Sequence, residues 1–128
     1  MIKFTALLLL CFSFVSVVQA QETKFFESLY DVPVMPSLYE VKDMAISFDK
    51  PRGRIAYAGA QADNSLSQAE IIAFYDKVLP QMGWHKLDDM AKSYEYGRES
   101  ERLRLFFVQS NGAELLQFML FPAQNSEK

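Results

Sequence analysis

The dipeptide Asn111-Gly112 lies between two alternating runs and constrains the fold more than any other feature of this chain. Asn and Gly tolerate the positive φ values of a two-residue type I′ turn, whose twist suits a β-hairpin. If these residues form the turn, Ser110 faces Ala113 and the register of both strands follows. The opposed apolar pairs on one face are then Leu103 with Leu120, Leu105 with Phe118, and Phe107 with Leu116. This pattern predicts a hairpin with one buried face.

The other face of this hairpin is mixed in character. It holds Arg102, Arg104, Phe106, Val108, Leu115, Gln117, Met119 and Phe121. Arginine beside aromatic and aliphatic residues is typical of interfaces and is not needed on a purely solvated sheet. The predicted interaction surface comprises Arg102, Arg104, Phe106, Met119 and Phe121. The alternative is that the N-terminal part of the chain covers this face.

Shorter alternating segments predict the rest of the sheet. Residues 44–48 and 54–58 flank a turn that contains Pro and Gly, which predicts a first hairpin. Residues 84–87 and 93–96 predict two further strands, which a solvated loop at 88–91 joins.

A helix is predicted between the first hairpin and these later strands. Ser67 and Glu70 form an S-x-x-E capping box, in which each side chain satisfies a backbone N–H of the first turn. Its apolar stripe consists of Ile71, Phe74, Tyr75, Val78, Leu79 and Met82. Because these residues recur with helical spacing, one face of the helix needs a sheet to pack against.

The segment FYDKVLPQMGW, Phe74–Trp84, combines paired aromatics, a proline and Gly-Trp. Pro80 removes a backbone donor near the helix end, and Gly83 can adopt the positive φ that closes a helix. Trp84 then begins a strand and covers the seam between helix and sheet. We favour this core packing over a ligand-binding role for the segment.

These elements predict an α+β fold, with a single antiparallel β-sheet and one main helix packed on one face, in the order ββαββββ. The predicted domain spans residues 44–122, followed by a polar tail at 123–128. An extended arm at residues 21–43, which contains Pro33 and Pro36, precedes the domain.

Residues 1–20 have the layout of a secretory signal peptide, with Lys3, an apolar run and Val18-Gln19-Ala20 before the cut. The mature chain is expected to start at Gln21. An uncleaved anchor is the first alternative, but the apolar run is shorter than the roughly 20 residues of a span. A lipoprotein modified at Cys11 is the second alternative.

Charge and cysteine content limit the partners. The formal net charge is −3, and signal cleavage removes a lysine but none of the 16 acidic residues. This argues against a nucleic-acid partner or an anionic membrane held by bulk charge. Cleavage also removes the only cysteine, so the mature domain has no disulfide or thiolate. We expect no stable membrane insertion after cleavage.

Residue patterns for catalysis or metal binding are weak. His85 is the only histidine and is expected to face away from Trp84 on its strand. Asp63 and the pair Asp88-Asp89 lack the alternating oxygen ligands of a calcium loop. The chain has no phosphate-binding glycine loop, serine elbow or zinc spacing. We therefore expect no catalytic residues, cofactor or metal, and no enzyme activity.

A group of arginines and a pair of tyrosines each have two possible roles. Arg52 and Arg54 flank the first turn, and Arg98, Arg102 and Arg104 cluster in the later strands. A joined basic patch would bind a carboxylate, a phosphate or a glycan acid, and the alternative is an edge strand protected by charge. Tyr94 and Tyr96 share a strand face, where they would stack on a sugar or extend the core.

The segments DVPVMP (Asp31–Pro36), FDKPRGRI (Phe48–Ile55) and FYDKVLPQMGW together resemble a group of small exported alphaproteobacterial proteins without an assigned function. The resemblance covers most of the mature chain, and it rests partly on an FY-x3-LP-x2-GW helix-to-strand motif. It implies a Gram-negative envelope setting, with periplasm favoured over culture medium, and it implies no reaction.

Two functions follow as hypotheses. The first is a non-enzymatic periplasmic module that binds an envelope protein or component through the mixed sheet face or through the edge that carries Arg102 and Arg104. The second is a carrier of a small apolar ligand, held between helix and sheet or beneath the arm. A closed cavity would favour the carrier, whereas a filled core and an exposed mixed face would favour the interaction module.

Overall fold

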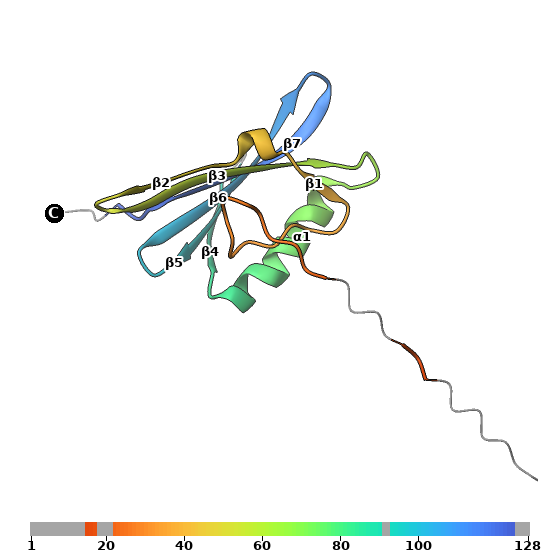
Figure 1. The fold of residues 1–128 in the computed structure, drawn as a ribbon, viewed down its shortest axis with the longest axis horizontal. Helices are drawn as coiled ribbons and strands as arrows, with labels where there is room; N and C mark the ends of the chain where they lie inside the picture. Colours follow the sequence, from red (N-terminus) through yellow and green to blue (C-terminus); the bar gives the residue numbers. More distant parts are fainter. Residues whose placement is uncertain (1–14, 18–21, 91–92, 125–128) are drawn as a thin grey trace, which may run out of the picture.

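The computed structural model describes residues 15–17, 22–90 and 93–124, and most of the predicted signal peptide lies outside these ranges. Figure 1 shows the sheet with the helix α1 beside it. The elements are β1 (Leu38–Glu40), η1 (Lys42–Met44), β2 (Ile46–Lys50), β3 (Gly53–Ala62), α1 (Gln68–Val78), η2 (Leu79–Met82), β4 (His85–Met90), β5 (Ser93–Arg98), β6 (Glu101–Ser110) and β7 (Ala113–Pro122).

The strands form one antiparallel sheet in the order β1-β3-β7-β6-β5-β4, with β2 also paired to β3. β1 and β2 occupy different halves of the same edge, because β1 pairs with the end of β3 and β2 with its beginning. The predicted α+β class with one helix on an antiparallel sheet is confirmed. The predicted order ββαββββ omits β1, a three-residue strand within the predicted arm.

The hairpin of β6 and β7 has the predicted register. Asn111 and Gly112 have φ values of 50° and 78°, as a type I′ turn requires. The apolar pairs are Leu103 with Leu120, Leu105 with Phe118, and Phe107 with Leu116. The Asn-Gly turn therefore determines which side chains of both strands share a face.

The helix begins and ends as the sequence predicts. The Ser67 hydroxyl accepts a bond from the Glu70 backbone, and the Glu70 carboxylate accepts one from the Ser67 backbone. Pro80 lies in the 3-10 turn η2, which Gly83 closes with a φ of 87°. This turn directs Trp84 back beneath the helix.

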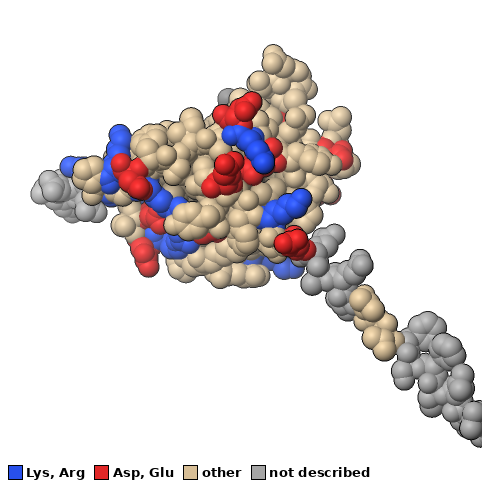
Figure 2. All heavy atoms as spheres, in the orientation of Figure 1, with Lys and Arg blue, Asp and Glu red and all other residues tan. Residues whose placement is uncertain are grey.

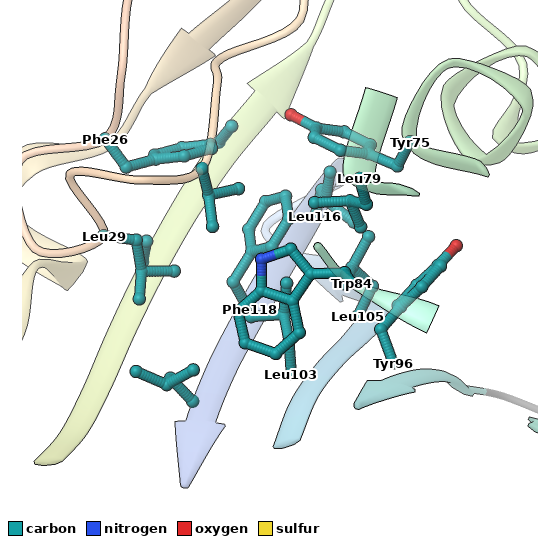
Figure 3. Close-up of a cluster of buried hydrophobic side chains, with 14 of the residues drawn as sticks. Phe26, Leu29, Tyr75, Leu79, Trp84, Tyr96, Leu103, Leu105, Leu116 and Phe118 are labelled. Atoms are coloured by element: carbon teal, nitrogen blue, oxygen red, sulfur yellow. The ribbon is translucent and has the colours of Figure 1, made fainter. Parts of the chain in front are cut away.

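The space between α1 and the sheet is filled by apolar side chains (Figure 3). Trp84 is fully buried, which confirms the predicted packing role for this residue. Tyr75 meets the Phe118 ring edge-on at 5.2 Å between ring centroids. Tyr96 is also fully buried, and its hydroxyl donates to Asp76, so the core interpretation holds for this tyrosine. We call this side of the sheet the covered face.

The N-terminal segment lies on the covered face beside α1 (Figure 1). The Phe26 ring is 4.8 Å from that of Phe118, and the Tyr75 hydroxyl donates to the Pro33 carbonyl oxygen at 2.9 Å. The alternative that this arm covers the mixed face is therefore wrong for residues 22–38, although the arm ends in η1, whose Met44 side chain lies over Gly59 on that face. The buried arm residues Phe26, Leu29, Val32 and Leu38 complete the core. Burial of their apolar surface stabilises the packing of the arm on the face that carries α1.

A second correction concerns residues 88–91, for which the sequence predicts a loop. β4 continues through Met90, with Asp88 opposite Glu95 and Asp89 opposite Tyr94. A register shift between Lys86 and Asp88 accommodates one extra residue. The bulge hides the alternation that identifies a strand in the sequence. The predicted tail residues 125–128 lie outside the described ranges.

Candidate interaction surface

The face of the sheet opposite α1 contains all five residues of the predicted interaction surface. We call it the open face. Among the described residues, the short η1 turn lies above it in Figure 1, where the Met44 side chain packs over Gly59. Its β6 and β7 residues are Arg102, Arg104, Phe106, Val108, Leu115, Gln117, Met119 and Phe121, all partly exposed. The register of β2 and β3 extends it with Ile46, Phe48, Ile55 and Tyr57. The predicted surface is therefore one part of a larger face.

One row of register partners crosses five strands of the open face. Its members are Glu95, Arg104, Met119, Tyr57 and Ile46. The Tyr57 and Ile46 side chains are 37% and 50% exposed, and they are register partners on β3 and the edge strand β2. The row shows that apolar exposure is continuous from β7 to the edge strand β2.

Arg104 lies near the centre of this face between an acid and an aromatic ring. Its guanidinium donates to Glu95 at 3.3 Å and lies 5.1 Å from the Phe121 ring centroid. The Nε atom of Arg104 is buried without a hydrogen-bond acceptor in the described part of the chain. A buried guanidinium N–H without an acceptor costs folding free energy, and the outer Nη atoms are the donors of Arg104 that another molecule would contact.

Arg102 is held differently from Arg104. Its guanidinium donates to the carbonyl oxygen of Glu101 at 3.0 Å. It lies over Gly97 on β5, where a Cβ atom would be 3.1 Å from Nη1 of Arg102. Leu87 leans over the same glycine. The missing side chain at Gly97 thus gives Arg102 and Leu87 their place on the open face.

Arg98 does not belong to a joined basic patch with Arg102 and Arg104. It lies over the Trp84 ring on the covered face and donates to the Met82 carbonyl oxygen at 3.2 Å. The alternative of one joined arginine patch is therefore wrong, because alternate strand residues point to opposite faces. The alternative of a charged sheet edge is also wrong for Arg102 and Arg104, because β6 lies between β7 and β5.

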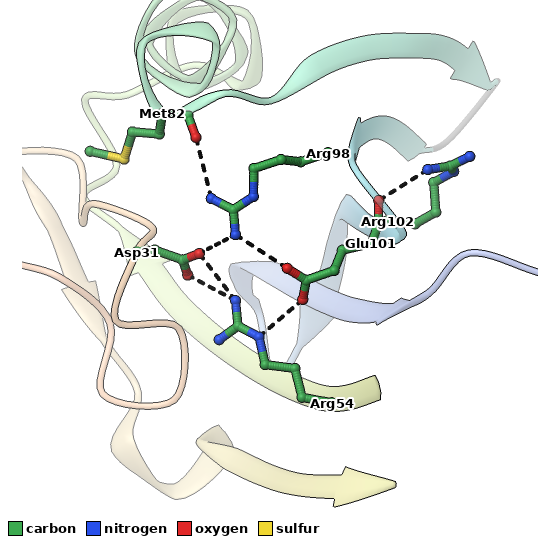
Figure 4. Close-up of polar contacts among 6 residues, drawn as sticks. All are labelled: Asp31, Arg54, Met82, Arg98, Glu101 and Arg102. Carbon is green, nitrogen blue, oxygen red and sulfur yellow. Dashed lines mark hydrogen bonds and ion pairs between the residues drawn. The ribbon is translucent and has the colours of Figure 1, made fainter. Parts of the chain in front are cut away.

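Arg98 instead belongs to a network of four charged residues, shown in Figure 4. Asp31 of the N-terminal segment pairs with Arg98 and with Arg54 of β3, the latter at 3.1 Å. Glu101 bridges Arg54 at 3.0 Å and Arg98 at 3.3 Å. The network joins the N-terminal segment to three strands, and its two arginines balance the charges of its two carboxylates.

The electrostatics of the network favour ionised Asp31. Partial burial raises the pKa of Asp31, but hydrogen bonds and positive charge from Arg98 and Arg54 more than compensate. The pKa therefore lies below its usual range, which fits a structural clamp.

A groove lies between the N-terminal segment and the helix. Its volume is about 830 Å³, in the size range of small-molecule sites. The apolar lining includes Pro33, Val34, Met35, Phe74, Val78 and Met82. Glu22, Lys24 and Gln81 add polar groups. The predicted closed site between helix and sheet is filled, so this groove is where the carrier hypothesis remains open.

Residues considered for chemistry are dispersed. His85 is exposed at the start of β4, and Asp63 directly follows the end of β3. In the residues that the structure describes, no three His, Cys, Asp or Glu side chains gather as metal ligands. No helix within those residues is both long and apolar enough to cross a membrane.

Sequence reasoning misses two components of these surfaces. The alternation in the first hairpin predicts strands that contain Ile46, Phe48 and Tyr57, and it also places these residues on one face, which is the signal that could have found them. Asp31 is predicted only as part of an arm, and its pairing with Arg54 and Arg98 has no signal in the sequence.

Charged side chains of both signs are mixed on the side of the molecule that Figure 2 shows.

Comparison with protein-family models, with curated proteins and with solved structures finds no match to this chain. The resemblance to exported alphaproteobacterial proteins therefore stays a prediction, and function has to be inferred from the surfaces themselves.

Proposed function

We propose that this chain is a non-enzymatic binding module of the bacterial envelope, which acts through the open face. Signal cleavage after Ala20 would release it into the periplasm. This proposal rests on one observation: apolar side chains are exposed continuously from Met119 across Tyr57 to Ile46, next to arginines. An exposed apolar patch with a polar border is characteristic of protein contact sites.

The position of the N-terminal segment supports this proposal. This segment is the nearest candidate to cover the open face, but Phe26 and Leu29 are buried on the opposite side. The open face consequently keeps its apolar groups available to a partner.

The test compares two tyrosines of similar chemistry. Tyr57 is on the open face, whereas Tyr30 is 71% exposed on the N-terminal segment. Tagged mature chain captures partners from envelope extract, followed by mass spectrometry. Tyr57→Ser and Arg104→Glu should lose the captured partner, and Tyr30→Ser should keep it. Denaturation curves establish that each variant is folded.

Unchanged capture by folded Tyr57→Ser and Arg104→Glu would place the interface elsewhere and end this assignment. Export has its own measurement, the N-terminal sequence of protein from a periplasmic fraction. It should begin at or near Gln21, and an intact Met1 in the cytosol would contradict export.

The groove between the N-terminal segment and α1 favours a second candidate function, the carriage of a small apolar ligand. Native mass spectrometry of protein purified from its source without denaturation should then show a bound molecule. Val78→Trp would fill the groove and abolish the added mass, whereas Tyr57→Ser would preserve it. A bare mass in the unaltered protein would argue against the carrier.

A further inference from the structure

We infer that the open face binds an acidic partner, a protein segment that presents carboxylates beside apolar side chains to Arg102 and Arg104. This inference rests on the proposed binding function and narrows its partner class. It follows from the charge, the hydrogen-bonding state and the spacing of the two arginines.

The charge of the open face is opposite to that of the whole chain. The formal net charge of the protein is −3. The described strand side chains of the open face nevertheless include three cations, Lys50, Arg102 and Arg104, and one carboxylate, Glu95. This local excess of positive charge favours an acidic partner.

The two arginines retain capacity for new acceptors. Arg102 donates to a backbone carbonyl and has no ion pair with a carboxylate of the described residues. Arg104 has a single, long contact, from Nη2 to Glu95 at 3.3 Å, so its other Nη donors have no acceptor within the same residues. A guanidinium group carries five N–H donors in a fork that matches a carboxylate, so both groups can bind a further carboxylate.

The spacing of the arginines suits an extended peptide. Arg102 and Arg104 are two residues apart on β6, which separates their Cα atoms by roughly 7 Å. Alternate side chains of an extended segment have the same spacing. Phe121 and Met119 lie opposite the two arginines on β7 and offer apolar contact beside each carboxylate. The surface can therefore contact the carboxylates and the apolar side chains of one extended peptide at the same time.

A second copy of the chain fits the open face less well. In a two-fold dimer the same patch meets itself, so the arginines of both copies would enter one interface. Facing like charges disfavour such a contact. An acidic partner removes this repulsion.

The experiment selects random dodecapeptides displayed on phage against the immobilised mature chain. Selected peptides should be enriched in Asp and Glu next to aromatic or aliphatic residues. Their binding should weaken about tenfold for Arg102→Gln. It should also weaken in about 1 M salt, where the screening length is about 3 Å. Arg52→Gln is the matched control, because Arg52 is exposed in the turn between β2 and β3.

Different outcomes separate this inference from the proposed function. Selection of neutral or basic peptides that folded Tyr57→Ser no longer binds would overturn the acidic partner and leave the binding face intact. Peptides that bind Tyr57→Ser and Arg102→Gln as well as the unaltered chain would overturn both, as would the absence of any enrichment. A dimer in light scattering that Arg102→Gln dissociates would identify a second copy as the occupant instead.

Discussion

The two faces of this sheet are made by the same strands but differ in what lies against them. On the covered face, Leu103, Leu105 and Phe118 are almost fully buried beneath α1 and the N-terminal segment. On the open face, their chain neighbours Arg104, Phe106 and Met119 remain partly exposed. Side chains that alternate along one strand therefore serve separate purposes, stability on one side and proposed recognition on the other.

The difference is set by where the N-terminal segment packs. Because Phe26 and Leu29 join the covered face, that face becomes a complete core. The open face keeps a mixture of arginine and apolar groups without a cover from this segment. Substitutions on the covered face should therefore affect unfolding, and those on the open face should affect binding. The following predictions test this division in order of expected size.

Trp84→Ala should have the largest effect, a loss of about 3 to 5 kcal/mol in the free energy of unfolding, because it deletes a fully buried aromatic side chain. Phe121→Ala on the open face is the control and should lose less than half as much. Chemical denaturation measures both. Equal losses would show that the open face is also a structural core.

Phe26→Ala should destabilise the protein by about 3 kcal/mol, since the ring is 1% exposed and contacts Phe118. Its chain neighbour Phe25 is 42% exposed and provides a matched control. Phe25→Ala should change stability by less than about 1 kcal/mol. If Phe26→Ala is equally mild in chemical denaturation, the N-terminal segment is not part of the covered core.

Gly83→Val should cost roughly 1 to 3 kcal/mol, because a β-branched residue is strained at the φ of 87°. The added Cβ would also come within 3.3 Å of Arg98 Cδ, on the covered side of the sheet. Gly83→Asn should be milder, since Asn tolerates positive φ. Thermal unfolding of both variants compares them, and equal tolerance would refute the role of Gly83 in ending the helix.

Asp31→Asn should lower stability at pH 7 by about 1 to 2 kcal/mol, because it removes the charge that pairs with Arg54 and Arg98. The pKa of Asp31 is lower in the folded protein than in the unfolded chain, so its contribution is complete above the unfolded value. The contribution disappears as the pH falls through the folded value.

Denaturation curves of the unaltered protein and Asp31→Asn at several pH values test this dependence. The difference in unfolding free energy should shrink from about pH 5 downward, as the pH approaches and passes the ordinary Asp pKa of about 3.9. Asp43→Asn, at an exposed position in η1, is the control and should leave the profile unchanged. A difference that grows on acidification would contradict the clamp.

Local signals in the sequence predict several elements correctly. The Ser67–Glu70 capping box, the turn at Asn111-Gly112 and the helix end at Gly83 are all present. Each depends on backbone conformations and hydrogen bonds within a few residues, so the local sequence contains the necessary information. The loop prediction fails at residues 88–90 because a bulge interrupts the alternation of β4.

The candidate site is predictable from the sequence only in part. The register that the Asn111-Gly112 turn imposes on β6 and β7 places Arg102 and Met119 on one face. The extension to Tyr57 and Ile46 requires the pairing of β3 with β7, which lie far apart in the chain. Contacts between distant segments are not specified by local periodicity.

By itself, the sequence determined the hairpins, the capped helix and the two different faces of the last hairpin, because turn chemistry and strand alternation act over short distances. Only the tertiary structure decided which face the N-terminal segment covers and that Arg98 separates from Arg102. Both depend on long-range packing: Phe26 meets Phe118, and Asp31 meets Arg54 and Arg98. These contacts complete one core and leave the opposite face largely without a cover from the N-terminal segment.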